Sequence, residues 1–210
     1  MVVVKLSSTW RKIALTTHVT ASVGWFGAVV AFLALAGIGL RGDGSDGAIR
    51  SAYIAMEPIG WFVIVPFSLA SLATGLIQSL GTQWGLFRHY WVVAKLLITV
   101  GASLLLMLHM QVVSSVAEAA SAGALSAHHL RDPRMQLVAD AGAASVILLI
   151  AIALSIFKPQ GRTPSGGPIS DGSQVTAERT PMVYAFWFVM VAVIIAVVIR
   201  HLTGGMPGHH

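Results

Sequence analysis

The chain has 210 residues, of which 56% are hydrophobic and only 10% are charged. Soluble globular domains carry about 25% charged residues, so this composition excludes an ordinary water-soluble protein and indicates a surface that mostly faces lipid. The net charge is +5, but the basic residues lie at the ends of apolar runs and form no stripe, which argues against nucleic acid as a partner. The sequence contains no cysteine, which excludes disulfides, thiolate metal sites and cysteine nucleophiles.

Five apolar runs are long enough to cross a bilayer, for which a helix needs about 20 residues. They cover Ile13–Leu40, Glu57–Leu80, Tyr90–Val113, Val138–Phe157 and Met182–Arg200. Only helices and closed barrels satisfy their backbone hydrogen bonds within lipid, and continuous apolar runs without strand-type alternation favour helices. The sequence therefore predicts an all-α, polytopic integral membrane protein with a four-helix transmembrane core plus a fifth transmembrane helix.

The segments between these runs divide the chain into three parts. Arg41–Arg50 is rich in glycine and aspartate and predicts a turn, whereas the alanine-rich Ser114–Gln136 predicts a helical extension of the third run. Residues 158–181 have low complexity and predict a flexible cytoplasmic linker. We therefore expect a four-helix membrane core over residues 1–157, then the linker, and a fifth helix with a histidine-containing tail over residues 182–210.

Small residues, a proline and basic residues predict how the first two helices pack and point. Gly24, Gly27 and Ala31 follow one another at helical spacing and predict a face for close helix packing. Pro66 lies inside the second run, where we expect a kink and a freed backbone carbonyl. Three basic residues precede the first helix, which usually dominates membrane topology, so we expect the N-terminus in the cytoplasm and the C-terminus outside.

Ionisable residues within the spans are costly in lipid and are therefore candidates for function. His18 lies in the first run, with Ser22 and Trp25 following on the same helical face. It is either a packed, hydrogen-bonded histidine, or a ligand to haem iron or another metal, or a proton carrier. Lys95 lies at a matching depth in the third run, where it either snorkels to the headgroups or contacts an anionic group of a bound ligand. Arg88 and His89, at the inner end of the same run, would join it in a basic inner mouth.

A second candidate site lies at the expected outer side. His109 follows Lys95 on the same face of the third helix, within about 40° and about 21 Å higher, which fits one ion path or two stacked sites. Histidines and methionines gather on this side: Met107, His109, Met110, His128, His129, His201, Met206, His209 and His210. Imidazole and thioether together are a copper-like ligand set. His109, Met110 and His201 are therefore candidate copper ligands, although no pair has a dedicated metal-binding spacing.

Two acids are expected at the outer ends of helices. Glu57 and Asp140 stand at the predicted starts of the second and fourth spans, where a solvent-exposed carboxylate suits the first helical turn. No carboxylate pair is therefore expected within the spans. The sequence has no phosphate-binding glycine loop and no GxSxG nucleophile motif.

Two stretches resemble a group of small bacterial membrane proteins. HVTASVGWFG (His18–Gly27) is similar to their first helix, and TGLIQSLGTQWGLFRHYWVVAKLLITVGASLLLMLHM (Thr74–Met110) is similar to their central hairpin. The group includes CopD-type copper-resistance proteins, HemJ-type protoporphyrinogen oxidases and an uncharacterised, mostly actinobacterial family that this sequence resembles most closely. The resemblance covers residues 10–113 and implies a location in the bacterial cytoplasmic membrane. The predicted fifth helix, the linker and the histidine tail depart from the HemJ-like pattern.

The resemblance also implies functions for the candidate residues. In HemJ-like proteins, the first-helix histidine and the third-helix lysine handle haem or porphyrin, which would make His18 and Lys95 residues that bind haem b. In CopD-like proteins, the group of interest is copper instead of haem. Three functions therefore stay open: haem or porphyrin binding with a redox role, copper handling or transport, and a non-enzymatic subunit or assembly factor. The lipid bilayer is a partner in each, and the third adds other membrane subunits or further copies of the chain.

Overall fold

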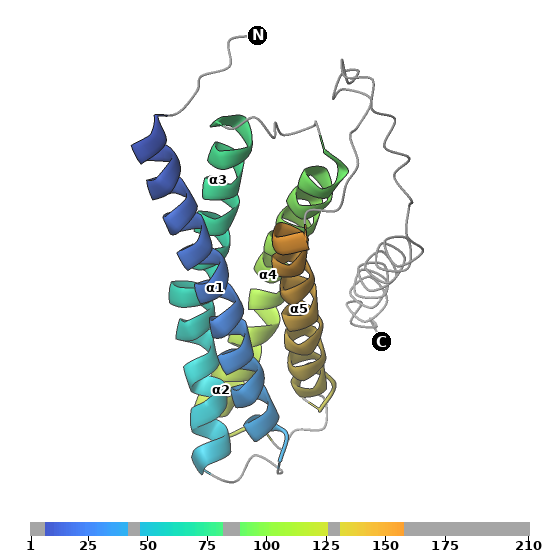
Figure 1. The fold of residues 1–210 in the computed structure, drawn as a ribbon. Coiled ribbons are helices and arrows are strands. Elements are labelled where there is room, and N and C mark those ends of the chain that lie inside the picture. The colour runs from blue at the N-terminus through green and yellow to red at the C-terminus, as the bar shows by residue number, and fades with distance from the viewer. Residues whose placement is uncertain (1–6, 42–46, 82–88, 126–130, 158–210) are drawn as a thin grey trace.

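A computed structural model describes residues 7–41, 47–81, 89–125 and 131–157 of the chain, and this part is a helical bundle (Figure 1). Its elements in chain order are α1 (Ser8–Gly39), α2 (Gly47–Ile59), the π-helix η1 (Gly60–Ile64), α3 (Val65–Gly81), α4 (Tyr90–Ser121) and α5 (Arg131–Phe157). Four stretches, namely α1, the continuous α2–η1–α3, α4 and α5, are long and apolar enough to cross a membrane. The all-helical class and the four-helix core agree with the prediction. The predicted linker, fifth helix and tail (158–210) lie outside the described residues.

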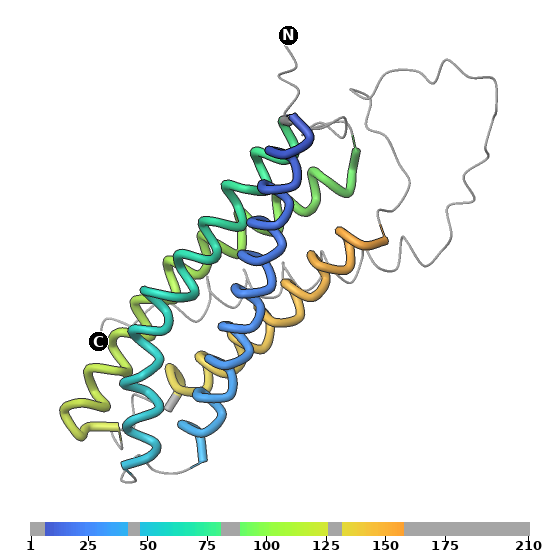
Figure 2. The backbone as a smooth tube through the Cα atoms, turned by 60° about the vertical axis from the view of Figure 1, so that its left-hand side comes forward, coloured from blue at the N-terminus to red at the C-terminus, as the bar shows by residue number. Residues whose placement is uncertain are grey.

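The four stretches form a ring in which each packs against two neighbours. The helix α1 contacts α2–α3 and α5, and α4 contacts the same two partners from the opposite side (Figures 1 and 2). Successive spans run in opposite directions. The N-terminal end of the bundle therefore holds the starts of α1 and α4 and the ends of α3 and α5. We call the opposite end, where α2 begins, the far end.

The first helix begins before the predicted apolar run. Ser7 is the N-cap, and its hydroxyl accepts a hydrogen bond from the backbone N–H of Trp10 at 3.5 Å. The predicted small-residue face is used at one of its two glycines. A Cβ at Gly24 would lie 2.9 Å from the ring of Phe67 on α3, whereas one at Gly27 would meet nothing within 4 Å. The close packing of α1 against α3 therefore leaves no room for a side chain at Gly24.

The second span differs from the prediction at its start. The helix begins at Gly47, inside the predicted turn, so Glu57 lies in the last turn of α2 and is half-buried instead of occupying a first turn. The kink predicted at Pro66 stays a prediction, but a π-helix lies just before this residue. There the backbone N–H of Val65 bonds to the carbonyl of Gly60, one residue further back than in an α-helix.

Large apolar side chains cover the outside of the bundle as well as its core. The far half is filled by Phe32, Tyr53, Met56, Met110 and Val113, each at most 4% exposed. Other large side chains point outward on each span and are more than half exposed: Val23, Phe62, Leu69, Leu97, Leu104, Leu108 and Leu149. An aqueous surface would not carry so many contiguous apolar groups. These faces support contact with the lipid bilayer.

Two arginines at the far end stabilise the ends of helices. Arg134 is 8% exposed, and its guanidinium donates to the carbonyl of Gly39 at 2.6 Å and to the hydroxyl of Tyr53 at 3.0 Å. Arg50 donates to the carbonyls of Ala120 (2.9 Å) and Ser121 (3.1 Å). The last carbonyls of a helix lack partners within it and carry partial negative charge. The two guanidinium groups therefore cap α1 and α4, a role that a count of loop charges does not reveal.

Candidate functional site

His18 is fixed by hydrogen bonds between α1 and α3. The residue is 8% exposed, and its Nδ1 lies 3.1 Å from the backbone carbonyl of Ser71 and 3.0 Å from Oγ1 of Thr74. The Thr74 hydroxyl donates its own proton to the carbonyl of Ala70 at 2.6 Å, so it accepts from the imidazole. Both partners of Nδ1 are therefore acceptors, which places the ring proton on Nδ1 and leaves Nε2 with a lone pair.

Lys95 reaches this lone pair from the opposite side of the ring of helices. Its Nζ lies 3.1 Å from Nε2 of His18 and donates to Oγ of Ser155 on α5 at 2.6 Å. The matching depth predicted for the histidine and the lysine is therefore confirmed as direct contact. The ammonium turns into the bundle instead of extending to the headgroups. The contact joins α1 and α4, which are not neighbours in the ring.

Further polar residues extend the network along α3. Oγ of Ser71 lies 2.8 Å from Oγ of Ser22, and Nε2 of Gln78 donates to the carbonyl of Ala14 at 2.9 Å. Four residues of this network were not among the candidates predicted from the sequence: Ser71, Thr74, Gln78 and Ser155. The spacing in α3 could have indicated this network. Positions 71, 74 and 78 are three and four residues apart, so their polar side chains share one helical face. The His18 ring also packs closely against Gly75, where a Cβ would lie 3.2 Å from it.

A groove of about 750 Å³ lies beside this network at the N-terminal end of the bundle. All four spans contribute to its wall, with Arg11, His18, Ser71, Lys95, Thr99 and Ser155 among its polar lining. Binding sites for small molecules span roughly 300–1,000 Å³ and combine apolar walls with a few placed polar groups. Exposed Arg11 and Lys12 supply positive charge to this groove. Arg88, which was predicted to do so, lies outside the described residues.

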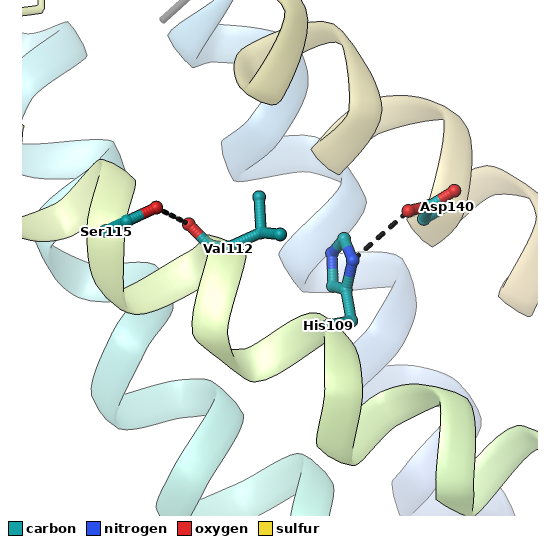
Figure 3. Close-up of polar contacts among 4 residues, drawn as sticks. All are labelled: His109, Val112, Ser115 and Asp140. Atoms are coloured by element: carbon teal, nitrogen blue, oxygen red, sulfur yellow. Dashed lines mark hydrogen bonds and ion pairs between the residues drawn. The ribbon is translucent and has the colours of Figure 1, made fainter. Parts of the chain in front are cut away.

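The second candidate site has a different composition from the one predicted. His109 is buried, and its Nδ1 lies 3.1 Å from Oδ2 of Asp140 on α5; the two side chains point toward each other (Figure 3). The expectation of an exposed Asp140 in a first helical turn is therefore wrong. The helix α5 begins at Arg131, because the apolar run at Val138 is preceded by a polar helical segment. This shift of the helix start carries the carboxylate into the bundle.

The structure describes two of the three candidate copper ligands, His109 and Met110. Met110 is 1% exposed and packs against the π-helix, where a Cβ at Gly60 would lie 2.7 Å from its sulfur. His201 lies outside the described residues. Among the residues that the structure describes, no group of three or more histidine, cysteine, aspartate or glutamate side chains could hold a metal ion.

The face of α4 that carries both candidate sites follows two stacked cavities. Lys95 and Thr99 line the groove, whereas Ala102, Leu106 and His109 line a separate cavity of about 80 Å³. Trp25 of α1 and Leu148 of α5 line both, so these two residues form the boundary between the groove and the smaller cavity. The stripe predicted from helical spacing thus lines two cavities, one above the other.

Comparisons with protein-family models, with curated proteins and with solved structures found no match to this chain. The possible functions must therefore be weighed on the geometry of its own residues.

Proposed function

We propose that this integral membrane protein binds haem b or a related porphyrin in the groove, with Nε2 of His18 directed at the iron and with a redox role. The main support is the oriented imidazole of His18 on the wall of a groove of about 750 Å³, with the ammonium group of Lys95 3.1 Å from its Nε2. The resemblance of the two helices to HemJ-like proteins points to the same residues.

The hydrogen bonds of His18 suit a metal ligand. Histidines that bind metals almost always donate their second ring N–H to a carbonyl or carboxylate, which fixes the ring and makes the ligating nitrogen more basic. The Ser71 carbonyl is placed for that purpose. Lys95 occupies Nε2 in this structure, but its ammonium also has Ser155 as a partner. Rotation of its flexible stem would free Nε2 and keep one hydrogen bond.

The charges around the groove suit an amphipathic anion. A haem carries two propionate carboxylates on one edge of an otherwise apolar ring. Lys95 would neutralise one carboxylate inside the groove, and the exposed Arg11 and Lys12 are available at the N-terminal end of the bundle. The apolar part of the ring would lie against residues such as Trp25 and Leu148. When bound, the iron would supply one-electron redox chemistry.

The visible spectrum of the purified protein tests this function. Haem is supplied during expression, and wild type is compared with His18→Ala, Lys95→Gln and His89→Ala. His89 is the matched control, because it is a described histidine that does not line the groove. We expect a stoichiometric Soret band in wild type and His89→Ala, its loss or a clear shift in His18→Ala, and weaker haem retention in Lys95→Gln.

Two results would overturn the proposal. One is the absence of a Soret band from folded wild-type protein. The other is a band in folded His18→Ala that equals the wild-type band in position and intensity. Circular dichroism and size-exclusion chromatography establish folding independently of haem. Copper handling and a subunit role have no specific supporting contact among the described residues.

A further inference from the structure

The groove opens toward lipid along one seam, between α1 and α5. These helices lie close together at the far end and diverge toward the N-terminal end (Figures 1 and 2). Four apolar residues on them line the groove and are at least 50% exposed: Leu15, Val19, Val23 and Ile156. On the opposite wall, formed by α3 and α4, the apolar lining residues are buried or half-buried: Leu72, Leu76, Val92 and Leu96. A ligand can therefore reach the groove sideways, from the lipid beside α1 and α5.

An apolar stripe on each of the two helices borders this seam. The stripes consist of Leu15, Val19 and Val23 on α1 and of Leu148, Ile152 and Ile156 on α5. Residues four apart lie on the same face of a helix, so each stripe runs along its own helix. The exposed fraction on α5 falls from 70% at Ile156 to 6% at Leu148. The seam is therefore wide at the N-terminal end and closes at Leu148.

The length of the groove matches one leaflet of a bilayer. Leu15 lies toward its open end, and Trp25, which is 3% exposed, lies at its inner end. They are ten residues apart in α1, which corresponds to a rise of about 15 Å. This rise is half of the hydrocarbon thickness of about 30 Å, and an acyl chain of one leaflet covers the same depth. The groove is therefore long enough to hold one acyl chain of a membrane lipid.

The charged residues that line the groove are all basic. They are Arg11, Lys12 and Lys95. Arg11 and Lys12 are exposed and lie one helical turn before Leu15, at the open end. The four acids among the described residues are not part of the groove lining: Glu57, Glu118, Asp132 and Asp140. Phosphate groups form strong charge-assisted hydrogen bonds with arginine and lysine. The open end therefore suits a lipid whose headgroup has a net negative charge.

We propose that the groove binds one anionic phospholipid of the surrounding bilayer. Its phosphate contacts Arg11 and Lys12, and one of its acyl chains enters the seam and lies between the stripes of α1 and α5. The other acyl chain stays in the bilayer. The same walls would hold haem, so the lipid occupies the haem-free protein and leaves when haem binds. Lipid binding itself requires no haem, so this proposal and the haem proposal can fail independently.

Native mass spectrometry of the full chain, purified without haem in a mild detergent, tests lipid binding. The protein is mixed with phosphatidylglycerol, which is anionic, or with phosphatidylcholine, which has no net charge, each with the same acyl chains. We expect one phosphatidylglycerol per chain, retained several-fold more often than phosphatidylcholine at equal concentration. The double variant Arg11→Gln/Lys12→Gln should lose this preference. Arg41→Gln should keep it, because Arg41 is exposed but does not line the groove.

A bulky side chain in the seam tests where the acyl chain lies. Val19→Trp fills part of the seam and should reduce retention of phosphatidylglycerol several-fold. Val30→Trp makes the same change on α1 at a residue that is 42% exposed and does not line the groove, so it should retain the lipid as wild type does. If Val19→Trp does not fold, Ile156→Trp replaces it. Its control is Leu149→Trp, at a 56% exposed position of α5 that does not line the groove.

Four results would overturn the proposal. The first is folded wild-type protein that retains no lipid at a ratio of one per chain, and the second is equal retention of the two lipids. The third is a variant with a filled seam that retains as much phosphatidylglycerol as its control, or a double variant that keeps the wild-type preference. The fourth is a dimer without lipid, because a second copy of the chain would then cover the seam. Circular dichroism and size-exclusion chromatography establish that each variant is folded.

Discussion

Replacing Arg134 by methionine should destabilise the far end of the bundle more than any single exposed substitution. The guanidinium joins three spans, because it belongs to α5, donates to Gly39 on α1 and to Tyr53 on α2, and its Cζ lies 5.4 Å from the centre of the Tyr53 ring. Methionine has a flexible, unbranched side chain that is shorter than that of arginine but comparable in volume, and it has no donor. The variant therefore removes the hydrogen bonds with little change in packed volume.

The expected magnitude follows from two hydrogen bonds and the burial of their donor. A hydrogen bond to a charged group contributes about 1.5–3 kcal/mol in soluble proteins, so two give roughly 3–6 kcal/mol. Hydrogen bonds between membrane helices average only about 0.6 kcal/mol, which would give about 1 kcal/mol. Arg134 is 8% exposed, and water therefore has little access to the vacated partners. We expect a loss of about 3 kcal/mol in the free energy of unfolding.

Unfolding in increasing concentrations of a denaturing detergent, followed by circular dichroism, measures this loss. Arg41→Met is the matched control, because Arg41 is exposed just beyond α1 and should change stability by less than about 0.5 kcal/mol. Tyr53→Phe and the double variant complete a thermodynamic cycle whose coupling energy should be about 1 kcal/mol or more. A loss in Arg134→Met no larger than that in Arg41→Met would refute the assignment of Arg134 as a buried cap.

Four further variants test other parts of the bundle. Gly24→Ala should lower the free energy of unfolding by about 1–3 kcal/mol, because its Cβ would clash with the ring packed against it, whereas Gly27→Ala, in open space, should be neutral or stabilising in the same detergent assay. Arg50→Met should cost about 1 kcal/mol, because the last carbonyls of α4 lose their cap, and hydrogen exchange should rise at that helix end but not in α1. Gly75→Ala should displace the His18 ring and weaken haem retention in the spectroscopic assay, and retention equal to wild type would contradict that close approach.

The sequence predicted the parts of the fold that depend on hydropathy alone. Runs of about 20 apolar residues define spans because lipid offers the backbone no hydrogen bonds, and the four described spans follow. Their ends were harder to predict. Polar helical turns at Gly47 and Arg131 extend beyond the apolar windows, so hydropathy assigned Glu57 and Asp140 to first turns. A carboxylate that finds a partner within the bundle, as Asp140 does in His109, can lie deeper than a window of average hydropathy indicates.

The candidate site was predictable to the extent that one helical face reveals it. Helical spacing placed Lys95 and His109 on one stripe, and depth matched Lys95 to His18. Spacing within one helix cannot show what faces it from another, and so Thr74 and Ser155, the partners that orient the imidazole and the ammonium, were missed. Both are residues whose side chains usually bond to their own helix. Each does so here, and the same hydroxyl oxygens then accept from a second helix.

The placement of the two arginines and of the polar network divides the bundle into halves with different physical roles. At the far end, the guanidinium groups of Arg50 and Arg134 donate hydrogen bonds to the carbonyls of helix ends. The neighbouring core is filled by residues such as Met56 and Val113. At the N-terminal end the polar groups of His18 and Lys95 face a groove. Packed apolar cores resist rearrangement, whereas the hydrogen bond between His18 and Lys95 can be exchanged for bonds to a ligand. A change in ligand occupancy should therefore move the N-terminal half of α4 and leave its far half in place.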